Sequence, residues 1–363
     1  MDKEGKQIRI AVVPQAKDYL NNELFNLNNK SLNRDNSLKF FTELRKLLLS
    51  NNIQIETIDR FPSLKNVDYV LFFTLDLKWY RYVYFNGKAN KSIYIALEPE
   101  VVDTHHSKSG MQMLLKLFRY IFTWNDDFID NENIFKISFP YFFNTCKKKT
   151  GFEDKKLLVN ISANKYSKHP DELYSERYKI IKYCDGKDYF ELYGRNWEKE
   201  LFKSYKGTVS FKNTVYNKFR FALCLENMKN VNGYITEKIL DCFCAGIVPV
   251  YYGAANIEKY IPETCYIKYD KFKSPEQLIN YLSGISKEEY NNYLVSIQNY
   301  LNSKECKEFS PDNFYNTLMK IIKSDSINES VYNANFIIYY KYCIESLMKK
   351  LHLKEGGWSN ADR

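Results

Sequence analysis

The sequence contains no segment suited to crossing a membrane. Among its 363 residues there is no uninterrupted apolar run of about 18 residues, the length that a spanning helix needs. The apolar run near the N-terminus is too short for a secretory signal peptide and leads into an expected strand. These absences predict a cytoplasmic protein. Peripheral attachment at the inner membrane stays open as an addition to that prediction.

Metal-binding patterns are also missing. None of the eight cysteines belongs to a Cys-x-x-Cys pair, and Cys242 and Cys244 point away from each other on an expected helix. The cysteines therefore fit reduced thiols in a cytoplasmic protein rather than a zinc site. No Asp-x-Asp motif occurs, because Asp126 and Asp127 are adjacent. We expect no metal ion held by the protein.

Long basic runs, which nucleic-acid-binding proteins often carry, do not occur either. The chain has 53 Lys and Arg residues against 44 Asp and Glu residues, and its densest basic cluster is Lys147-Lys148-Lys149. Because acids are interleaved with the basic residues, we interpret most of this charge as solvated surface. A nonenzymatic basic protein that binds nucleic acid or anionic lipid is the alternative class, and its binding would depend steeply on salt.

The sequence does contain an alternation of apolar runs and helical patterns. Leu38, Phe41, Leu44 and Leu48 recur at helical spacing, whereas Asn21–Asn36 is polar and fits a surface loop. Such alternation predicts parallel sheets covered by helices, and the length calls for two domains. The expected strands are Ile8–Val13, 53–55, Tyr69–Phe73, Ile93–Leu97, Tyr120–Trp124, Ile137–Pro140, Leu157–Ile161, Phe190–Tyr193, Phe219–Leu225, Val248–Tyr252 and Cys265–Tyr269.

A polar segment at residues 147–154 suits a linker between the two halves. We therefore predict one Rossmann-like domain at residues 1–150, a second at 151–330 and a helical segment at 331–363. Two such domains would face a cleft, with ligands beyond the carboxyl ends of the strands. From Phe314 onward the helical spacing predicts a helix packed across both domains, and a helix on a membrane surface is the alternative.

Residues 219–253 carry most of the chemical information. They are expected to form a strand, a loop, a helix and a second strand. The first strand ends in the polar pair Glu226-Asn227, Asn232-Gly233 suits a tight turn, Thr236 is a good N-cap, and Gly246 ends the helix.

This arrangement suits a nucleotide diphosphate. A helix N-terminus offers free backbone N–H groups and a partial positive charge, to which Lys238 adds a full charge. Glu237 could accept hydrogen bonds from ribose hydroxyls, and Tyr234 could stack or donate from the loop. The alternative is that Glu237 and Lys238 only complement the end of the helix.

The same stretch resembles the donor-binding signature of the alpha-1,3/4-fucosyltransferases, glycosyltransferase family 10. The segments FRFALCLEN, YITEK and IVPVYYG match that signature in order and spacing, and IEKYIP also fits. The resemblance implies a GT-B fold, with an acceptor-binding domain first and a GDP-fucose-binding domain second. It implies transfer of L-fucose from GDP-fucose with inversion. A related transferase that uses another GDP-sugar is the alternative within this fold.

Outside this core the resemblance is more diffuse. Arg177 resembles the family's phosphate-binding arginine, Gly194-Arg195 resembles a pair found in some members, and Phe139-Pro140-Tyr141 resembles the segment before the linker. Glu98 resembles the acidic residue of the acceptor domain. The family usually has Glu-Ser-Pro there, whereas this chain has Glu98-Pro99-Glu100, so Glu100 is a rival for the same role.

The resemblance also implies roles for these residues. Glu98 is the expected general base, which removes the acceptor proton, and cations hold the departing diphosphate. The predicted donor-binding residues are Arg177, Arg195, Asn227, Tyr234, Thr236, Glu237 and Lys238.

The resemblance leaves the acceptor open. We expect a glycan that contains N-acetylglucosamine, of the Lewis type or on lipopolysaccharide, linked alpha-1,3 or alpha-1,4. With two cations and a helix N-terminus at the diphosphate, we expect no required cofactor. Mn or Mg could stimulate the reaction without being coordinated by the protein.

Overall fold

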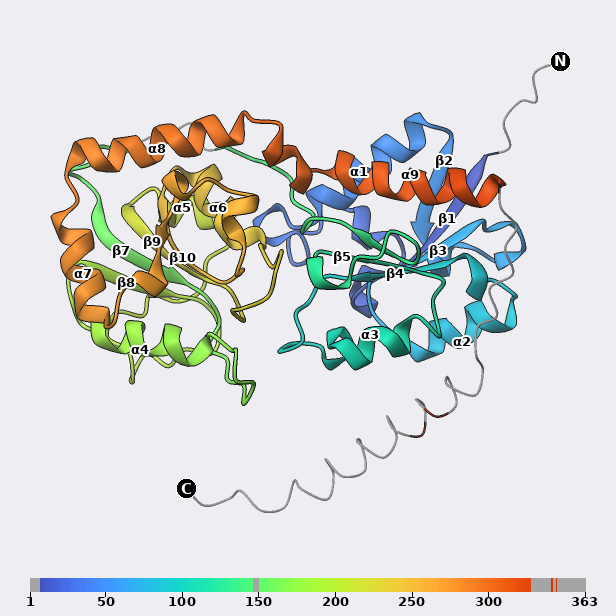
Figure 1. The fold of residues 1–363 in the computed structure, drawn as a ribbon, viewed down its shortest axis with the longest axis horizontal. Helices are drawn as coiled ribbons and strands as arrows, with labels where there is room; N and C mark the ends of the chain where they lie inside the picture. Colours follow the sequence, from blue (N-terminus) through green and yellow to red (C-terminus); the bar gives the residue numbers. More distant parts are fainter. Residues whose placement is uncertain (1–6, 146–149, 328–340, 342–343, 345–363) are drawn as a thin grey trace.

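The protein consists of two lobes, each built on a parallel β-sheet with helices on both faces (Figure 1). The computed structural model describes residues 7–145, 150–327, 341 and 344. The predicted α/β class with two Rossmann-like domains is confirmed. Within the described residues, no helix combines the length and the hydropathy of a membrane span.

The first lobe holds a six-stranded sheet in the order β2-β1-β3-β4-β5-β6. Its central strands read as continuous apolar runs because both faces are covered, by α1 and α9 on one side and by α2 and α3 on the other (Figure 1). The elements are β1 (Ile8–Val13), α1 (Lys39–Ser50), β2 (Ile53–Thr57), β3 (Tyr69–Phe72), α2 (Leu77–Phe85), β4 (Ser92–Ala96), α3 (Lys108–Leu114), β5 (Tyr120–Thr123) and β6 (Ile134–Lys136).

The strand predicted at Ile137–Pro140 is wrong. The edge strand β6 ends at Lys136, and the backbone N–H of Ile137 makes a last hydrogen bond of 2.9 Å to the carbonyl of Thr123. The chain then leaves the sheet, and Pro140 has no N–H to offer to a ladder. The apolar residues after Lys136 instead lead toward the second lobe, where the N–H of Tyr141 bonds to the carbonyl of Phe309 at 2.7 Å.

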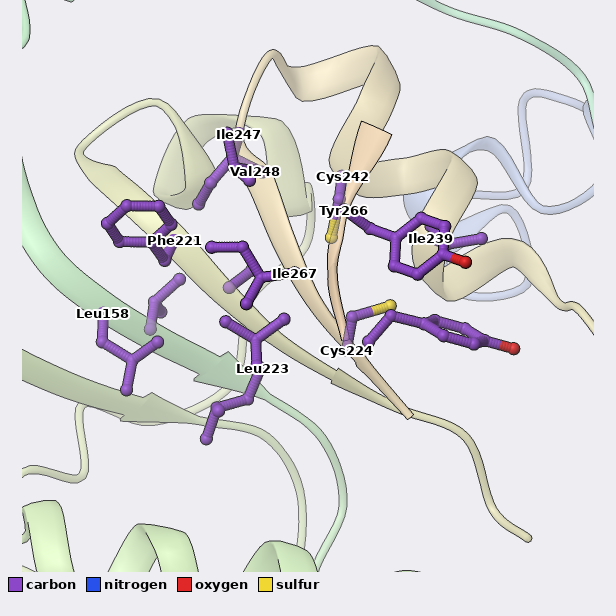
Figure 2. Packing of buried hydrophobic residues seen from close by; sticks show 14 of the residues in the cluster. Leu158, Phe221, Leu223, Cys224, Ile239, Cys242, Ile247, Val248, Tyr266 and Ile267 are labelled. Carbon is purple, nitrogen blue, oxygen red and sulfur yellow. The ribbon is translucent and has the colours of Figure 1, made fainter. Parts of the chain in front are cut away.

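The second lobe holds a five-stranded sheet in the order β11-β10-β9-β7-β8. Figure 2 shows its core, in which Leu158, Phe221 and Leu223 of the sheet pack beside Ile239 and Cys242 of the helix α6. The elements are β7 (Lys156–Ile161), α4 (Tyr174–Cys184), β8 (Phe190–Tyr193), α5 (Lys212–Tyr216), β9 (Phe219–Leu225), α6 (Glu237–Ala245), β10 (Val248–Tyr252), β11 (Ile267–Lys268), α7 (Pro275–Gly284) and α8 (Lys287–Leu301).

The last expected strand is much shorter than predicted. Of Cys265–Tyr269 only Ile267–Lys268 pairs with β10, because Cys265 ends one short 3₁₀ helix and Tyr269 begins another. An apolar run at a sheet edge can be buried without continuing the ladder, so its pattern alone did not mark where pairing stops.

The helix α9 (Pro311–Ile327) falls within the predicted second domain by sequence but contacts the first lobe. It crosses back from the second lobe and packs on α1 in the first (Figure 1). Phe314 on α9 contacts Phe40, Phe73 and Phe122, with ring centroids between 5.7 and 6.3 Å apart. A helix late in the sequence therefore completes the first core. The helical pattern predicted at Phe336–Leu347 lies outside the residues whose side chains the structure describes.

Both sheets have the same topology. In each, the first strand of the lobe lies second from one edge and the strand order reverses beside it, between β1 and β3 in the first sheet and between β7 and β9 in the second. Ligands of doubly wound sheets bind beyond the carboxyl ends of the strands at such a switch point. The fold thus offers two switch points, one in each lobe.

Candidate functional site

A cavity of about 770 Å³ lies between the two lobes and collects every site residue predicted from the sequence. Its size is in the range of small-molecule and cofactor sites. At the second switch point, Ser162 follows β7 and Asn227 follows β9, and both line the cavity. The predicted residues that line it are Glu98, Arg177, Arg195, Asn227, Tyr234, Thr236, Glu237 and Lys238.

The N-terminus of α6 is held by a buried carboxylate. Glu226 is fully buried and accepts hydrogen bonds from the backbone N–H of Thr236 at 2.9 Å and from its hydroxyl at 2.8 Å. The ammonium of Lys238 forms an ion pair with the same carboxylate at 2.9 Å. Burial acts to lower the pKa of Lys238, but Glu226 and Glu237 outweigh it and raise that pKa. Lys238 is therefore a fixed positive charge.

Glu226 is a buried residue that was not assigned to the site from the sequence. It directly follows β9 and precedes Asn227, but this position in the sequence does not predict an ion pair with Lys238. The motif's last glycine explains part of its placement. A Cβ atom on Gly253 would lie 2.5 Å from Cγ of Glu226, so a side chain there would displace the carboxylate.

Two arginines reach the cavity in different ways. Arg177 is almost fully buried, and one guanidinium nitrogen donates to the carbonyls of Leu225 and Glu226 at 2.6 and 2.7 Å. Burial lowers the pKa of Arg177. Arg195 is exposed and makes no ion pair within the described part of the chain. Thus Arg177 is fixed to the end of β9, whereas Arg195 is free to move toward a ligand.

The residue before Arg195 must be glycine. Gly194 has a φ of +135°, and a Cβ atom there would lie 1.9 Å from the carbonyl oxygen of Ser162. The ends of β7 and β8 can approach this closely only without a side chain. This close approach brings Arg195 to the rim of the cavity.

Glu98 follows β4 and presents its side chain to the cavity from the first lobe. Partial burial between the walls raises its pKa, and the negative charge of Glu237 across the cavity raises it further. The backbone is anchored on both sides: His106 Nδ1 lies 2.6 Å from the Glu98 carbonyl, and Trp124 Nε1 donates to the Leu97 carbonyl at 2.7 Å. These two contacts fix the position of the Glu98 backbone at the wall of the cavity.

Glu100, the rival of Glu98 in the sequence, does not line the cavity. The turn after Pro99 separates the two carboxylates, since the N–H groups of Val102 and Asp103 both bond to the Pro99 carbonyl. The geometry therefore favours Glu98 over Glu100.

The pKa of Glu237 is shifted in the opposite direction to that of Glu98. Burial acts to raise its pKa, but Lys238 and Lys212 outweigh burial and lower it. Glu237 therefore stays ionised while the pKa of Glu98 is raised. Two facing carboxylates with oppositely shifted pKa values are suited to different roles, one as a proton acceptor and one as a permanent negative charge.

Contacts between the two lobes lie beside the cavity. The buried ring of Tyr234 packs on Trp124 of the first lobe with centroids 4.6 Å apart. Asp126 accepts hydrogen bonds from Asn256 and Tyr260 of the second lobe, at 2.8 and 2.6 Å. Asp126 and Asp127 were considered above as a possible metal motif. In the structure, Asp126 forms hydrogen bonds that connect the two lobes.

A second compartment of about 460 Å³ opens beside Glu98 and Glu237, which line both spaces. Its wall is rich in aromatic side chains. Lys212, which also lines both spaces, forms ion pairs with Asp241 at 2.5 Å and Asp35 at 3.6 Å. Burial raises the pKa of Asp241 to about 6. This cluster was not predictable from the sequence, since its members are far apart in the chain. The aromatic residues of this compartment are Phe40, Phe41, Phe139, Tyr141, Phe142 and Phe211.

No group of three or more His, Cys, Asp or Glu side chains in residues 7–145 and 150–327 is placed to hold a metal ion. The six described cysteines, at 184, 224, 242, 244, 265 and 306, are all buried thiols. The expectation of metal independence stays a prediction.

The sequence of this chain is similar to those of known fucosyltransferases. The chain is 27% identical over 142 residues, 39% of its length, to an alpha-(1,3)-fucosyltransferase of Helicobacter pylori. It is 41% identical over 70 residues, 19% of its length, to the mouse 4-galactosyl-N-acetylglucosaminide 3-alpha-L-fucosyltransferase 9. These matches span only 29% and 19% of the length of those relatives.

The likeness in fold extends further than the likeness in sequence. A crystal structure of an alpha1,3-fucosyltransferase with GDP superimposes with a TM-score of 0.58, covering 92% of this chain and 94% of that one at 17% identity. At that identity the match establishes the GT-B fold alone. Residues 153–334, half of the chain, match the C-terminal region of glycosyltransferase family 10 (fucosyltransferase). The ion-paired N-terminus of α6 and both ends of β9 lie inside that match, and the chain belongs to glycosyltransferase family 10.

Proposed function

We propose that the protein transfers L-fucose from GDP-fucose to a hydroxyl of a glycan that contains N-acetylglucosamine. The observation that carries the proposal is the single cavity in which Glu98 of one lobe faces Glu237 and Lys238 of the other. Family membership supports fucosyl transfer, and one fold neighbour is an alpha1,3-fucosyltransferase solved with GDP-fucose.

The diphosphate of the donor would lie at the N-terminus of α6. There the backbone N–H groups of the first turn and the ammonium of Lys238 offer positive charge, and Arg177 and Arg195 line the same space. Asn227, Tyr234 and Thr236 would contact the nucleoside or the sugar. Because Glu226 already fixes Lys238, this positive field exists before the donor binds.

The reaction would proceed by one displacement with inversion at the anomeric carbon. The acceptor oxygen forms the new bond to that carbon as the bond to the β-phosphate oxygen breaks, and the acceptor proton passes to Glu98. The raised pKa of Glu98 suits a general base, since a base works best when its pKa lies nearer the working pH. Glu237, which stays ionised, would accept hydrogen bonds from the transferred sugar and stabilise positive charge that develops on it.

The acceptor would enter through the compartment lined by aromatic residues. Glu98 and Glu237 form its boundary with the donor cavity, so a sugar in this compartment lies next to both carboxylates. Aromatic rings can cover the apolar faces of a sugar, while carboxylates accept bonds from its hydroxyls.

An assay with GDP-fucose and a panel of acceptors that contain N-acetylglucosamine tests the proposal, with the product linkage assigned by NMR. We expect transfer in alpha-1,3 or alpha-1,4 linkage. A thermal-shift panel tests the donor independently: GDP at 100 times its Kd should stabilise by about 2.7 kcal/mol, and UDP and RNA should not. Transfer from another GDP-sugar but not GDP-fucose would establish the alternative donor.

We further propose that the reaction requires no metal ion, because the cations of the site can neutralise the departing diphosphate. Activity after exhaustive EDTA treatment should be retained, with at most modest stimulation by Mn or Mg. Complete loss that Mn restores would contradict this proposal without affecting the assignment of the donor.

A further inference from the structure

A third cavity, of about 260 Å³, lies at the switch point of the first sheet. Residues 14–17, which follow β1, and residues 74–76, which follow β3, form two of its walls, and Trp79 of α2 forms the third. We call it the Trp79 pocket. Switch points of doubly wound sheets are the usual place for a ligand, yet the reaction described above uses only the switch point of the second sheet.

The lining of the Trp79 pocket combines an indole ring with uncommitted polar groups. Trp79 is half-buried and lines the pocket, while Tyr82 packs edge-on against its ring and the Lys78 ammonium lies 5.2 Å from the ring centroid. The side chains of Gln15 and Lys17 are exposed and make no hydrogen bond or ion pair within the described residues. Asp76, in contrast, caps α2 by accepting a bond of 3.0 Å from the N–H of Trp79.

This chemistry fits one sugar ring better than a nucleotide. The volume is below the roughly 300–1,000 Å³ of cavities that enclose cofactor-sized ligands. A single exposed Lys17 offers little to a diphosphate, whereas an aromatic plane next to amide, hydroxyl and ammonium donors can cover a sugar face and bind its hydroxyls. Thr74 supplies the hydroxyl.

The Trp79 pocket is connected to the site of transfer. Gln15 lines both this pocket and the aromatic compartment beside Glu98. The short 3₁₀ helix Lys17–Tyr19 separates the Trp79 pocket from the cavity between the lobes, since Lys17 lines the pocket while Asp18 and Tyr19 line that cavity. A chain of sugars would therefore extend from Glu98 through the aromatic compartment and past Gln15 to Trp79.

We propose that the Trp79 pocket is a subsite for a sugar of the acceptor that lies beyond the one receiving the transferred fucose. This inference rests on the proposed function, and it makes the natural acceptor an oligosaccharide rather than a disaccharide. The first lobe then uses its switch point for the acceptor as the second lobe uses its own for the donor.

The test compares two acceptors that share the same reactive disaccharide, one free and one extended by two further sugars. In the wild type the extended acceptor should have the higher kcat/KM. Trp79→Ala should lower kcat/KM for the extended acceptor by about tenfold and leave the disaccharide unchanged, as expected when one aromatic contact is lost. Phe85→Ala, an exposed aromatic on the same helix outside the pocket, is the matched control and should change neither value.

Two additional variants keep the test decisive. Trp79→Phe retains an aromatic plane and should restore part of the preference for the extended acceptor. Gln15→Ala should lower kcat/KM for the extended acceptor, and this variant can be measured even if Trp79→Ala does not fold. Equal kcat/KM for both acceptors in the wild type, or an equal loss for both in Trp79→Ala and Gln15→Ala, would overturn the subsite.

A binding measurement separates this inference from the proposed function. Saturation-transfer NMR with the extended glycan and GDP reports binding without transfer. Binding that Trp79→Ala abolishes would support a carbohydrate subsite even if no acceptor were fucosylated, in which case the proposed function alone would fail. Wild-type transfer to a disaccharide with no binding contribution from Trp79 would sink the subsite and leave the proposed function standing.

Discussion

The two lobes share one strand order but hold their functional carboxylates in opposite ways. In the second lobe Glu226 is buried, ion-paired with Lys238 and bonded twice to Thr236. In the first lobe Glu98 is fixed only through the backbone around it, by His106 and Trp124, and its carboxylate faces the cavity. The proposed donor side is therefore part of the folded core, whereas the proposed acceptor side depends on one side chain whose backbone is held by neighbouring residues.

This difference predicts where mutations should be felt. Changes at the ion-paired end of β9 should affect folding and donor binding together, since the same contacts serve both. Changes at Glu98 should affect turnover alone, because its carboxylate contributes little to packing. Four substitutions can break or sharpen this contrast.

The largest effect is expected from Glu226→Gln. The substitution leaves the Lys238 ammonium without its buried counter-charge, and breaking a buried ion pair costs about 3–5 kcal/mol. Urea denaturation followed by circular dichroism measures the change in the free energy of unfolding. Glu100→Gln, outside the cavity, is the control and should be nearly neutral. A loss below about 1 kcal/mol in Glu226→Gln would show that the donor side is not integral to the core.

Glu98→Gln should cut kcat by roughly 100-fold or more, as the loss of a general base does. The free energy of unfolding and the affinity for GDP, measured by urea denaturation and calorimetry, should stay close to wild type. If activity survives in this variant and Glu100→Gln abolishes it, the base assignment moves to Glu100.

Lys238→Ala should weaken GDP binding by roughly 10- to 100-fold, since a hydrogen bond to a charged group contributes about 1.5–3 kcal/mol. Calorimetric titration with GDP measures it. The variant also leaves Glu226 buried without its partner, so the double variant Glu226→Gln with Lys238→Met is needed. The double variant should regain stability but not GDP affinity, and unchanged affinity in both would remove Lys238 from the phosphate site.

The smallest effect concerns pH. Glu98 must be ionised to act as the base, so kcat/KM should fall as the pH drops through its raised pKa. Because burial and ionised Glu237 both raise that pKa, Glu237→Gln should move the acid limb of the profile to lower pH by a fraction of a unit. Each profile is scaled to its own plateau. A limb that does not move, or moves upward, would show that the two carboxylates do not interact across the cavity.

The fold could be predicted well from the sequence where local patterns are long. Alternation of strands and helices indicated two doubly wound sheets, and Thr236 and Gly246 marked the ends of α6 as the structure has them. The sequence failed at Ile137–Pro140 and Cys265–Tyr269, where apolar residues are buried without pairing. From Phe314 onward the helical spacing predicted a helix packed across both domains, but that spacing shows only that the helix has an apolar face and not that α1 receives it.

The same limit on what local sequence patterns can predict applies to the site. Thr236, Glu237 and Lys238 lie within one contiguous stretch, so the sequence by itself determined their proximity at the start of a helix, because a strand–loop–helix unit fixes the spacing of its own residues. The sequence did not determine the ion pair of Lys238 with Glu226 or the approach of Arg177 and Arg195.

Only the tertiary structure decided the rest. The Lys212 cluster, the position of Glu98 rather than Glu100 in the wall of the cavity, and the Trp79 pocket depend on which strand ends lie at a switch point and on how the lobes face each other. Contacts between residues so distant in the chain follow from sheet order and from the packing of the lobes. The local spacing of residues in the sequence does not predict the sheet order or the packing of the lobes.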